Sequence, residues 1–195
     1  MTTRLLLSGL RDLRSLIVAP EGDLVDQLSL QLIRIGCHVR HAWPTKALDG
    51  DGEVDLIFTG QLNEHQHNTV CDFVNSFDGT LTVIAIVEYE SPTILAKIIE
   101  LGAHGVMTVP FDANKVLPTI VTARSNSLQL SNLLEENRKF RERLNASSII
   151  NRAKVLLMAE KDMSETQAHK YMSELAMRSR RKISEVAKEI AALSP

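Results

Sequence analysis

Short apolar runs alternate with amphipathic helical patterns over the first 115 residues of the chain. The apolar runs predict five buried strands, at residues 16–19, 37–42, 54–58, 81–87 and 105–109, the second being the weakest. Helices are predicted between them, at residues 23–35, 64–77 and 92–101. The crossover at residues 44–53 is rich in Gly and Asp and is expected to be mostly loop. This alternation predicts a flavodoxin-like, doubly wound parallel α/β sheet.

A long helix is predicted to follow, from about Lys115 into the 140s, because no Gly or Pro occurs between Pro118 and Pro195. A heptad register gives this helix an apolar seam, with position a at Leu130, Asn137 and Leu144 and position d at Leu133 and Phe140. Asn137 at position a favours a two-stranded parallel pair, and Glu136 at g can reach Arg141 at e of a partner helix. The seam predicts a homodimer joined by a short coiled coil.

The seam has a second interpretation. Leu130, Leu133, Leu134 and Phe140 can instead pack onto the chain's own domains, which is how most helical apolar stripes are used. Only about two heptads are well formed, and short isolated helices are marginal in water, so a dimer would also need contacts from the α/β domain. Both interpretations stay open at this point.

A small all-α bundle of three short helices is predicted at the end of the chain. The first helix spans residues 147–160 and buries one stripe, which consists of Ile150, Ala153, Leu156 and Leu157. Ser164 and Gln167 form a capping box that starts the second helix, and the third begins near Ile183. The pattern therefore predicts three parts: an α/β domain at 1–115, a linker helix at 116–146 and a helical bundle at 147–195.

Charge divides the chain in the same way. Residues 1–122 carry 8 Lys and Arg against 15 Asp and Glu, whereas residues 123–195 carry 14 against 9. The acidic half has a net charge of −7 and the basic half +5, which together give the −2 of the whole chain. Different partners are expected for the two halves. Six basic residues of the bundle are candidates for nucleic-acid contacts: Arg152, Lys154, Arg178, Arg180, Arg181 and Lys182. A charge run of this kind can also be a solvated surface.

No catalytic or metal-binding pattern is present. The chain lacks GxSxG, P-loop, CxxC and HExxH motifs, and Cys37 and Cys71 lie in unrelated contexts. No enzyme activity, metal ion or cofactor is therefore expected. No apolar stretch approaches the roughly 20 residues of a membrane span, so no membrane association and a cytoplasmic location are expected.

The α/β half resembles a response-regulator receiver domain in Asp55-Leu-Ile-Phe58 and in Gly102-Ala103 leading to Pro110-Phe111-Asp112. The resemblance implies a phosphoacceptor site of acidic residues, an acceptor Asp, a Ser or Thr, and a Lys. This chain instead has Glu21, Gly60 (Thr59 if the register slips by one), Val87 and Val109 at those positions. Aspartyl phosphorylation is therefore not expected of this pseudo-receiver. A sealed site is expected, on a domain that serves docking and dimerisation; the likeness can also reflect a common fold alone.

The C-terminal part, roughly residues 135–191, resembles the ANTAR domain of bacterial transcription antiterminators. The resemblance rests on Ala153-Lys154, Leu157-Met158, Ala168, Met172 and Ala176, and it departs at Val155, where many members have glycine. It implies binding of paired small stem-loops in nascent RNA, which prevents a downstream terminator hairpin from forming. Such hairpins are bound through shape, backbone and unpaired bases, so few aromatic residues are needed.

The whole chain resembles the antiterminators of bacterial aliphatic amidase operons, including residues 32–37, 87–92 and 98–101. This resemblance implies that a ligand-sensing negative regulator protein sequesters the antiterminator until an inducer releases it. The hypothesis is a positive transcription regulator that binds leader mRNA hairpins as a homodimer. The alternatives are a DNA-binding transcription regulator and a dimeric protein-interaction scaffold.

Overall fold

The computed structural model describes residues 10–48, 53–77, 80–89, 91–110 and 112–193. It divides into two compact units, and the boundary lies between Asn132 and Leu133. We refer to them as the N-terminal unit and the C-terminal unit. No described helix is long and apolar enough to cross a membrane.

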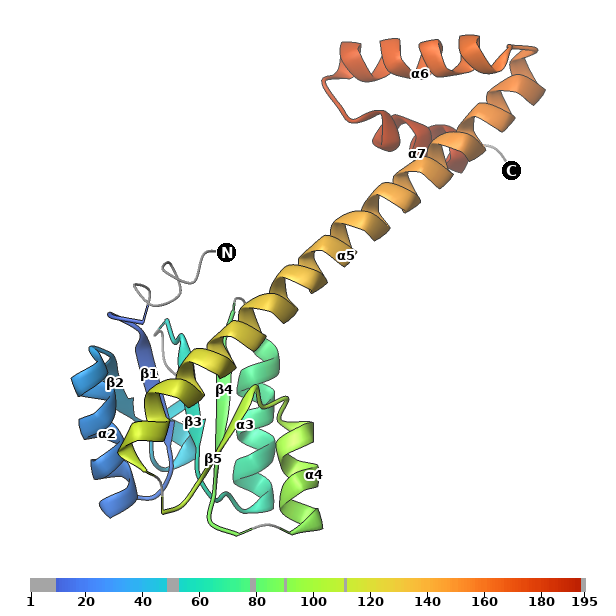
Figure 1. Ribbon diagram of the computed structural model, residues 1–195. Helices are drawn as coiled ribbons and strands as arrows, with labels where there is room; N and C mark the ends of the chain where they lie inside the picture. The colour runs from blue at the N-terminus through green and yellow to red at the C-terminus, as the bar shows by residue number, and fades with distance from the viewer. Residues whose placement is uncertain (1–9, 49–52, 78–79, 90, 111, 194–195) are drawn as a thin grey trace. The chain divides into compact units, whose positions relative to one another are not determined.

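The N-terminal unit contains a five-stranded parallel sheet in the order β2-β1-β3-β4-β5 (Figure 1). The strands are β1 (Arg14–Val18), β2 (His38–His41), β3 (Leu56–Thr59), β4 (Thr82–Val87) and β5 (Gly105–Thr108). This order confirms the predicted flavodoxin-like fold. Every residue of β4 is buried, whereas β2 is an edge strand with no fully buried residue, which explains its weak sequence signal.

Helices connect the strands where the apolar periodicity predicts them. They are α2 (Asp23–Ile35), α3 (Glu64–Ser76) and α4 (Pro92–Glu100), with a short 3₁₀ helix, η1 (Thr45–Leu48), in the second crossover. Gly36 ends α2 in the left-handed conformation, with φ of 100°. Asn63 caps α3 through a capping box, and the Ser91 hydroxyl accepts a hydrogen bond from the Ile94 amide at the start of α4.

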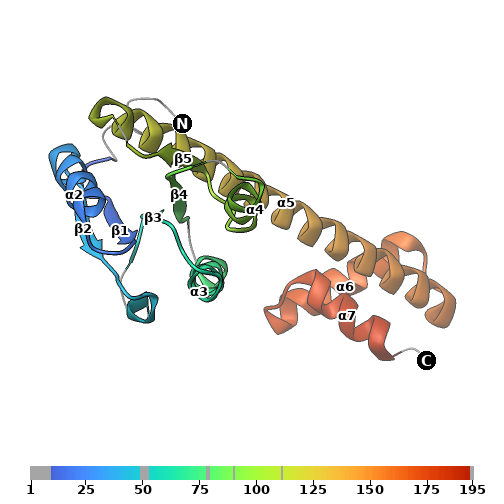
Figure 2. The ribbon, with the colours of Figure 1, turned by 90° about the horizontal axis from the view of Figure 1, so that it is seen from below.

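Helices lie on both sides of the sheet (Figure 2), and an apolar cluster packs against each face. α2 and the first turns of α5 (Ala113–Lys161) cover one face, where Leu28, Phe58 and Ile120 are fully buried. α3 and η1 cover the other face around Ile57 and Val70. Helices on both faces require strands that are apolar on both sides, and this is why the strands appear as continuous apolar runs in the sequence.

The helix α5 is a single element of 49 residues. The sequence pattern predicts a linker helix and a separate first helix of the bundle at residues 147–160, but the structure has one continuous helix through both. The physical reason is that nothing between Pro118 and Lys161 interrupts the backbone hydrogen bonds. The last turns of α5 therefore serve as the first helix of the bundle.

The bundle is completed by α6 (Glu165–Ser179) and α7 (Ile183–Leu193). Ser164 and Gln167 form the predicted capping box at the start of α6. The core consists of five buried residues, which are Ala153, Leu157, Ala168, Met172 and Ala187. Three of these are alanines, and small side chains allow helix backbones to approach closely. The C-terminal unit thus has its own small apolar core.

Candidate nucleic-acid interface

All six basic residues that are candidates for RNA contacts lie on helices or helix ends of the C-terminal unit. Two of them, Arg152 and Lys154, lie on the last turns of α5. The other four surround the junction between α6 and α7: Arg178, Arg180, Arg181 and Lys182. We call this second group the junction cluster. Its side chains are all on exposed residues, so they are available to a ligand in solution.

Arg180 ends α6 in a conformation that arginine rarely adopts. Its φ of 52° and ψ of 39° lie in the left-handed region, where helices usually place glycine. The backbone N–H of Arg181 donates to the Ala176 carbonyl oxygen at 3.0 Å and closes the helix end. Termination of α6 by itself would favour glycine at this position, because a side chain costs conformational energy there.

The six cations differ in their partners. Lys154 Nζ lies 3.0 Å from Glu165 Oε1, and Arg181 lies 2.8 Å from Glu189. Hydrogen bonds from these cations lower the pKa of Glu165 and of Glu189. Among the residues that the structure describes, the remaining four have no ion-pair partner: Arg152, Arg178, Arg180 and Lys182. These four cations are therefore open to an anionic ligand without first breaking an ion pair.

Apolar side chains are exposed on the same elements, although no sequence motif marks them as functional. Met177 is 72% exposed on α6 next to Arg178, and Val155 is 63% exposed on α5, one turn beyond Arg152. Met158 follows on the next turn of α5. For Val155 and Met158, the available signal was their position just outside the buried stripe of Ala153 and Leu157.

The predicted seam of α5 is exposed in the single chain. The exposed fractions of its apolar members are about half or more: Leu130 50%, Leu133 63%, Phe140 61% and Leu144 55%. Asn137 is also exposed. The coiled coil formed by these residues stays a prediction.

Charges beside the seam fall into two groups. At outer positions, Glu135 and Arg138 pair at 2.8 Å and Lys139 lies 3.3 Å from Glu135, all within one helix. Hydrogen bonds from Arg138 and Lys139 lower the pKa of Glu135 to about 2. Glu136 and Arg141, which flank the seam, have no ion pair among the described residues. The flanking charges thus stay available to a second helix.

The positions of the degenerate phosphoacceptor site all lie at or just after the carboxyl ends of strands. Glu21 is exposed after β1, Val87 is buried at the end of β4, and Val109 is partly buried against the core after β5. At Gly60, a Cβ atom would lie only 2.8 Å from Ala19 Cβ. Aspartate therefore cannot occupy the acceptor position unless β1 moves.

One expectation for this edge of the sheet is wrong. The apolar replacements predicted a sealed site, but Gly60 and Val87 line an open cavity of about 520 Å³ beside α3 and α4. α4 lines one side of this cavity, and it packs loosely, since none of its residues is buried. Such loose packing of one helix is a tertiary property that the apolar pattern of α4 did not indicate.

Two family models together match most of the chain. The model described as "AmiR, N-terminal" matches residues 13–124, and the model described as "ANTAR domain" matches residues 138–190. The aliphatic amidase regulator of Pseudomonas aeruginosa is 40% identical over 195 residues, covering 100% of this chain and 99% of that protein. The chain belongs to the AmiR family of ANTAR regulators. It is therefore placed among regulatory proteins, as the resemblance in the sequence indicated.

Solved structures extend the comparison for the fold of this AmiR-family chain. The signal receiver domain of an HD domain-containing protein from Pseudomonas fluorescens Pf-5 has a TM-score of 0.55 at 16% identity, covering 63% of this chain and 93% of that one. Full-length FixJ from B. japonicum has a TM-score of 0.52 at 12% identity, covering 94% of this chain and 100% of that one. The receiver-like fold is thus confirmed.

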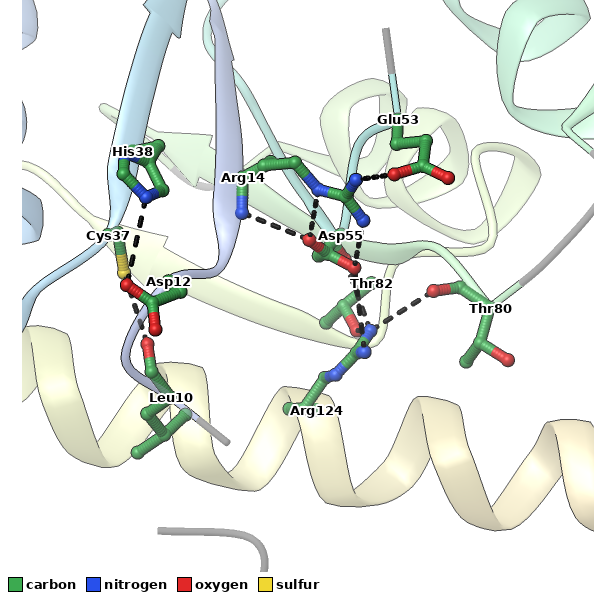
Figure 3. Close-up of polar contacts among 10 residues, drawn as sticks. All are labelled: Leu10, Asp12, Arg14, Cys37, His38, Glu53, Asp55, Thr80, Thr82 and Arg124. Carbon is green, nitrogen blue, oxygen red and sulfur yellow. Dashed lines mark hydrogen bonds and ion pairs between the residues drawn. The ribbon is translucent and has the colours of Figure 1, made fainter. Parts of the chain in front are cut away.

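The AmiR-family chain also contains a charged cluster that sequence analysis missed (Figure 3). Asp55, directly before β3, accepts hydrogen bonds from the Arg14 backbone N–H at 3.0 Å and from Arg14 Nε at 2.9 Å. Arg14 also pairs with Glu53. Arg124 of α5 donates to the carbonyl oxygens of Asp55 and Thr80, at 3.2 and 3.0 Å. The cluster fixes the beginning of α5 to the amino-terminal edge of the sheet.

The electrostatics of Asp55 follow from these contacts. Burial would raise the pKa of Asp55, but the hydrogen bonds and charge of Arg14, with the charge of Arg124, outweigh burial and lower this pKa. Burial lowers the pKa of Arg124, and Asp55 partly offsets that effect. Asp55 lies at the edge of the sheet opposite the degenerate phosphoacceptor positions, and its contacts join β1 and α5 to the start of β3.

Proposed function

We propose that this chain is a positive transcription regulator that acts by antitermination, through binding of hairpins in nascent leader mRNA. The observation that carries the proposal is the group of four exposed cations without ion-pair partners, within the segment that the ANTAR model matches. The relative named as aliphatic amidase regulator supports a regulatory role for the whole chain. The cytoplasmic location expected from the sequence is part of the proposal.

The junction cluster and Arg152 would contact the RNA backbone. Exposed arginine and lysine side chains bind phosphates and release condensed counterions, which gives affinity without sequence specificity. Lys154 and Arg181 can exchange their glutamate partners for phosphates, because exposed ion pairs contribute only about 0–1 kcal/mol. All six predicted residues therefore keep a role, with the unpaired four contributing most.

Exposed apolar side chains would complete the contact. Val155, Met158 and Met177 lie beside the cations and have no apolar partner that buries them. Unpaired loop bases offer flat apolar faces, and these are the parts of an RNA hairpin that proteins distinguish from duplex. Contacts of this kind favour hairpin RNA over duplex DNA.

A homodimer would present two bundles to two hairpins. The exposed seam of α5, with Asn137 at position a, fits a two-stranded parallel coiled coil. Glu136 and Arg141 remain available for pairing between the two helices, while outer charges pair within each helix. The α/β unit would contribute further contacts, because a two-heptad seam is weak by itself.

Control would come from a protein partner in place of phosphorylation. A ligand-sensing negative regulator would sequester the chain, and its release would allow RNA binding. The acidic α/β half, with a net charge of −7 over residues 1–122, offers a docking surface whose charge is opposite to that of the RNA-binding half. A side chain at position 60 would clash with Ala19 Cβ, and this contact supports regulation that is independent of phosphorylation.

The test is binding of the purified full-length chain to the two-hairpin leader RNA of its own operon. An equal-length duplex DNA and an RNA with scrambled loops serve as competitors. We expect selective retention of the leader RNA. The triple variant Arg178→Gln, Arg180→Gln and Lys182→Gln should weaken binding at least about tenfold and lower the salt-dependence slope by about two to three.

The matched control removes two arginines and one lysine from exposed positions of the α/β unit, as Arg34→Gln, Arg40→Gln and Lys115→Gln. It should bind the leader RNA as the wild type does. Equal retention of duplex DNA would instead favour a DNA-binding regulator. Absence of binding, or binding that the junction variant leaves unchanged, would favour a protein-interaction scaffold.

A further inference from the structure

A groove lies between α3 and α4, at the carboxyl ends of β3 and β4. It forms a cavity of about 520 Å³, which is within the range of small-molecule sites in proteins, roughly 300–1,000 Å³. Ligands of open α/β sheets bind outside the carboxyl ends of the strands. This groove is one strand away from the β1–β3 pair, where the strand order reverses and where the degenerate phosphoacceptor position Gly60 follows β3.

A hydroxyl without a partner lies in the wall of the groove. Thr59 is only 2% exposed, and its hydroxyl has no hydrogen-bond partner among the residues that the structure describes. Within those residues, the unpaired polar side-chain atom that is sealed from solvent is Ser15 Oγ. The Thr59 hydroxyl is therefore reachable from the groove. Buried hydroxyl groups normally form hydrogen bonds, so the Thr59 hydroxyl is available to a ligand that enters the groove.

A cation without a partner also lines the groove. Lys97 of α4 is half-buried and has no ion pair in the described part of the chain. The nearby carboxylates do not neutralise it: Glu100 is 3.3 Å from His67 Nε2, and Glu88 is exposed at the groove rim without an ion pair of its own. α3 and α4 also begin at the mouth of the groove, and the amino end of a helix favours negative charge.

The rest of the lining combines polar side chains, such as Gln61 and Asn63, with aliphatic ones. Val87, Ile94 and Ile98 contribute aliphatic side chains from β4 and α4, and Leu62 closes the groove before α3. A ligand that suits both the cation and these aliphatic side chains combines one negatively charged group with a short apolar body. A bare inorganic anion would leave the aliphatic walls in contact with water, and a neutral hydrocarbon would leave Lys97 and Thr59 unpaired.

We propose that this groove is a binding site for a small monocarboxylate with a short aliphatic chain. Its carboxylate pairs with Lys97 and accepts a hydrogen bond from the Thr59 hydroxyl. Its chain packs on Ile94, Ile98 and Val87. The site is distinct from the RNA interface, since every lining residue belongs to the α/β unit.

Hexanoate is the probe, with hexanamide as its neutral isostere and inorganic phosphate as an anion without an apolar part. Binding is followed on the full-length chain by NMR of isoleucine δ1 methyl groups. Ile94 and Ile98 report on the groove, and Ile149 and Ile183 in the C-terminal unit serve as internal controls. We expect hexanoate to shift the groove signals alone, at concentrations where hexanamide and phosphate shift none.

Two variants test the polar contacts. Lys97→Gln should weaken hexanoate binding about tenfold, the effect of losing one charge-assisted hydrogen bond. Lys115→Gln, the same change on α5 outside the groove, should leave binding unchanged. Thr59→Val should weaken binding without lowering the melting temperature, because the hydroxyl has no partner within the chain.

Several outcomes would overturn the proposal. They are the absence of a groove shift at millimolar hexanoate, equal shifts with hexanamide, and unchanged affinity in Lys97→Gln. Shifts with phosphate that match those of hexanoate would reduce the site to an unspecific anion contact and also overturn it. None of these readouts involves RNA, so the result is independent of the antitermination assay.

Discussion

Arg180 is a residue whose backbone and side chain have opposite requirements. The left-handed φ of 52° favours glycine, while the exposed guanidinium lies among cations that suit a phosphate backbone. The Arg180 side chain therefore does not stabilise the end of the helix at this position. Stability and RNA affinity should respond in opposite directions when this residue changes.

We predict that Arg180→Gly raises the unfolding free energy of the bundle by up to about 1 kcal/mol, because the left-handed conformation no longer costs energy. The same variant should weaken binding of the leader RNA. Thermal unfolding and filter retention measure the two effects. Arg178→Gly is the control: it lies in the last turn of α6 and should lower stability by up to about 1 kcal/mol. A less stable Arg180→Gly variant would contradict the backbone argument.

At Asp55, folding changes the pKa of the side-chain carboxyl group. Its pKa is lowered in the folded state, so the ionised carboxylate stabilises the protein above the unfolded-state pKa of about 3.9. This stabilisation is lost as the pH falls through the lower, folded-state pKa. The contacts of Arg14 and Arg124 thus become acid-sensitive.

We predict that Asp55→Asn lowers the unfolding free energy by about 1–3 kcal/mol at neutral pH, because Arg14 loses its anionic acceptor. The difference from the wild type should shrink as the pH falls below about 4. Denaturant unfolding at a series of pH values measures it. Asp12→Asn, at an exposed aspartate, should leave stability nearly unchanged. A difference that stays constant with pH would rule out the proposed charge effect.

At the scale of an element, α5 combines three roles along 49 residues. Its first turns are held to the sheet by Arg124 and by Ser127, whose hydroxyl donates to the Leu81 carbonyl oxygen at 3.0 Å. Its middle exposes the seam, and its last turns complete the bundle core with Ala153 and Leu157. The predicted dimer seam and the first helix of the bundle are therefore parts of the same continuous helix.

We predict that Glu136→Arg weakens the dimer about five- to tenfold, because two interhelical pairs become repulsive. Adding Arg141→Glu should restore the dimer by reversing the pair. Analytical ultracentrifugation of the full-length chain measures the dissociation constant. Glu142→Arg, at an outer position, should change it little. Failure of the double variant to restore association would place the interface elsewhere.

At the scale of the whole molecule, an α/β unit of receiver type is joined to an ANTAR bundle, and the phosphoacceptor positions lack the required groups. Mg²⁺ needs carboxylate ligands, and phosphoryl transfer needs an acceptor and a cation. Glu21 is the carboxylate that remains among these positions, while Val87 and Val109 replace the polar groups. These replacements agree with the proposed control by a protein partner.

We predict that a small phosphodonor such as acetyl phosphate leaves the full-length chain unmodified, even with Mg²⁺ present. Intact-mass spectrometry measures this, with a receiver domain that holds the complete set of residues as the positive control. Gly60→Asp should also remain unmodified, because it restores the acceptor carboxylate but not the Mg²⁺ ligands and the Lys that phosphoryl transfer requires. A phosphorylated wild-type chain would refute the assignment of a degenerate site.

Local chemistry made most elements predictable. Apolar runs identified the five strands, Gly36 marked the end of α2, and Ser164 with Gln167 marked the start of α6. Each of these signals acts within about one helical turn or one strand. The charge division and the junction cluster could also be predicted, because both follow directly from the order of charged residues in the sequence.

The sequence by itself thus determined the elements, their βαβ order and the basic character of the last helices. Tertiary structure decided what lies together: the cluster of Arg14, Asp55 and Arg124, the closure of Gly60 by Ala19, and the groove beside α4. It also decided which cations are paired. The physical reason is that these contacts join side chains from different elements, up to 69 residues apart, and packing of whole elements sets such distances.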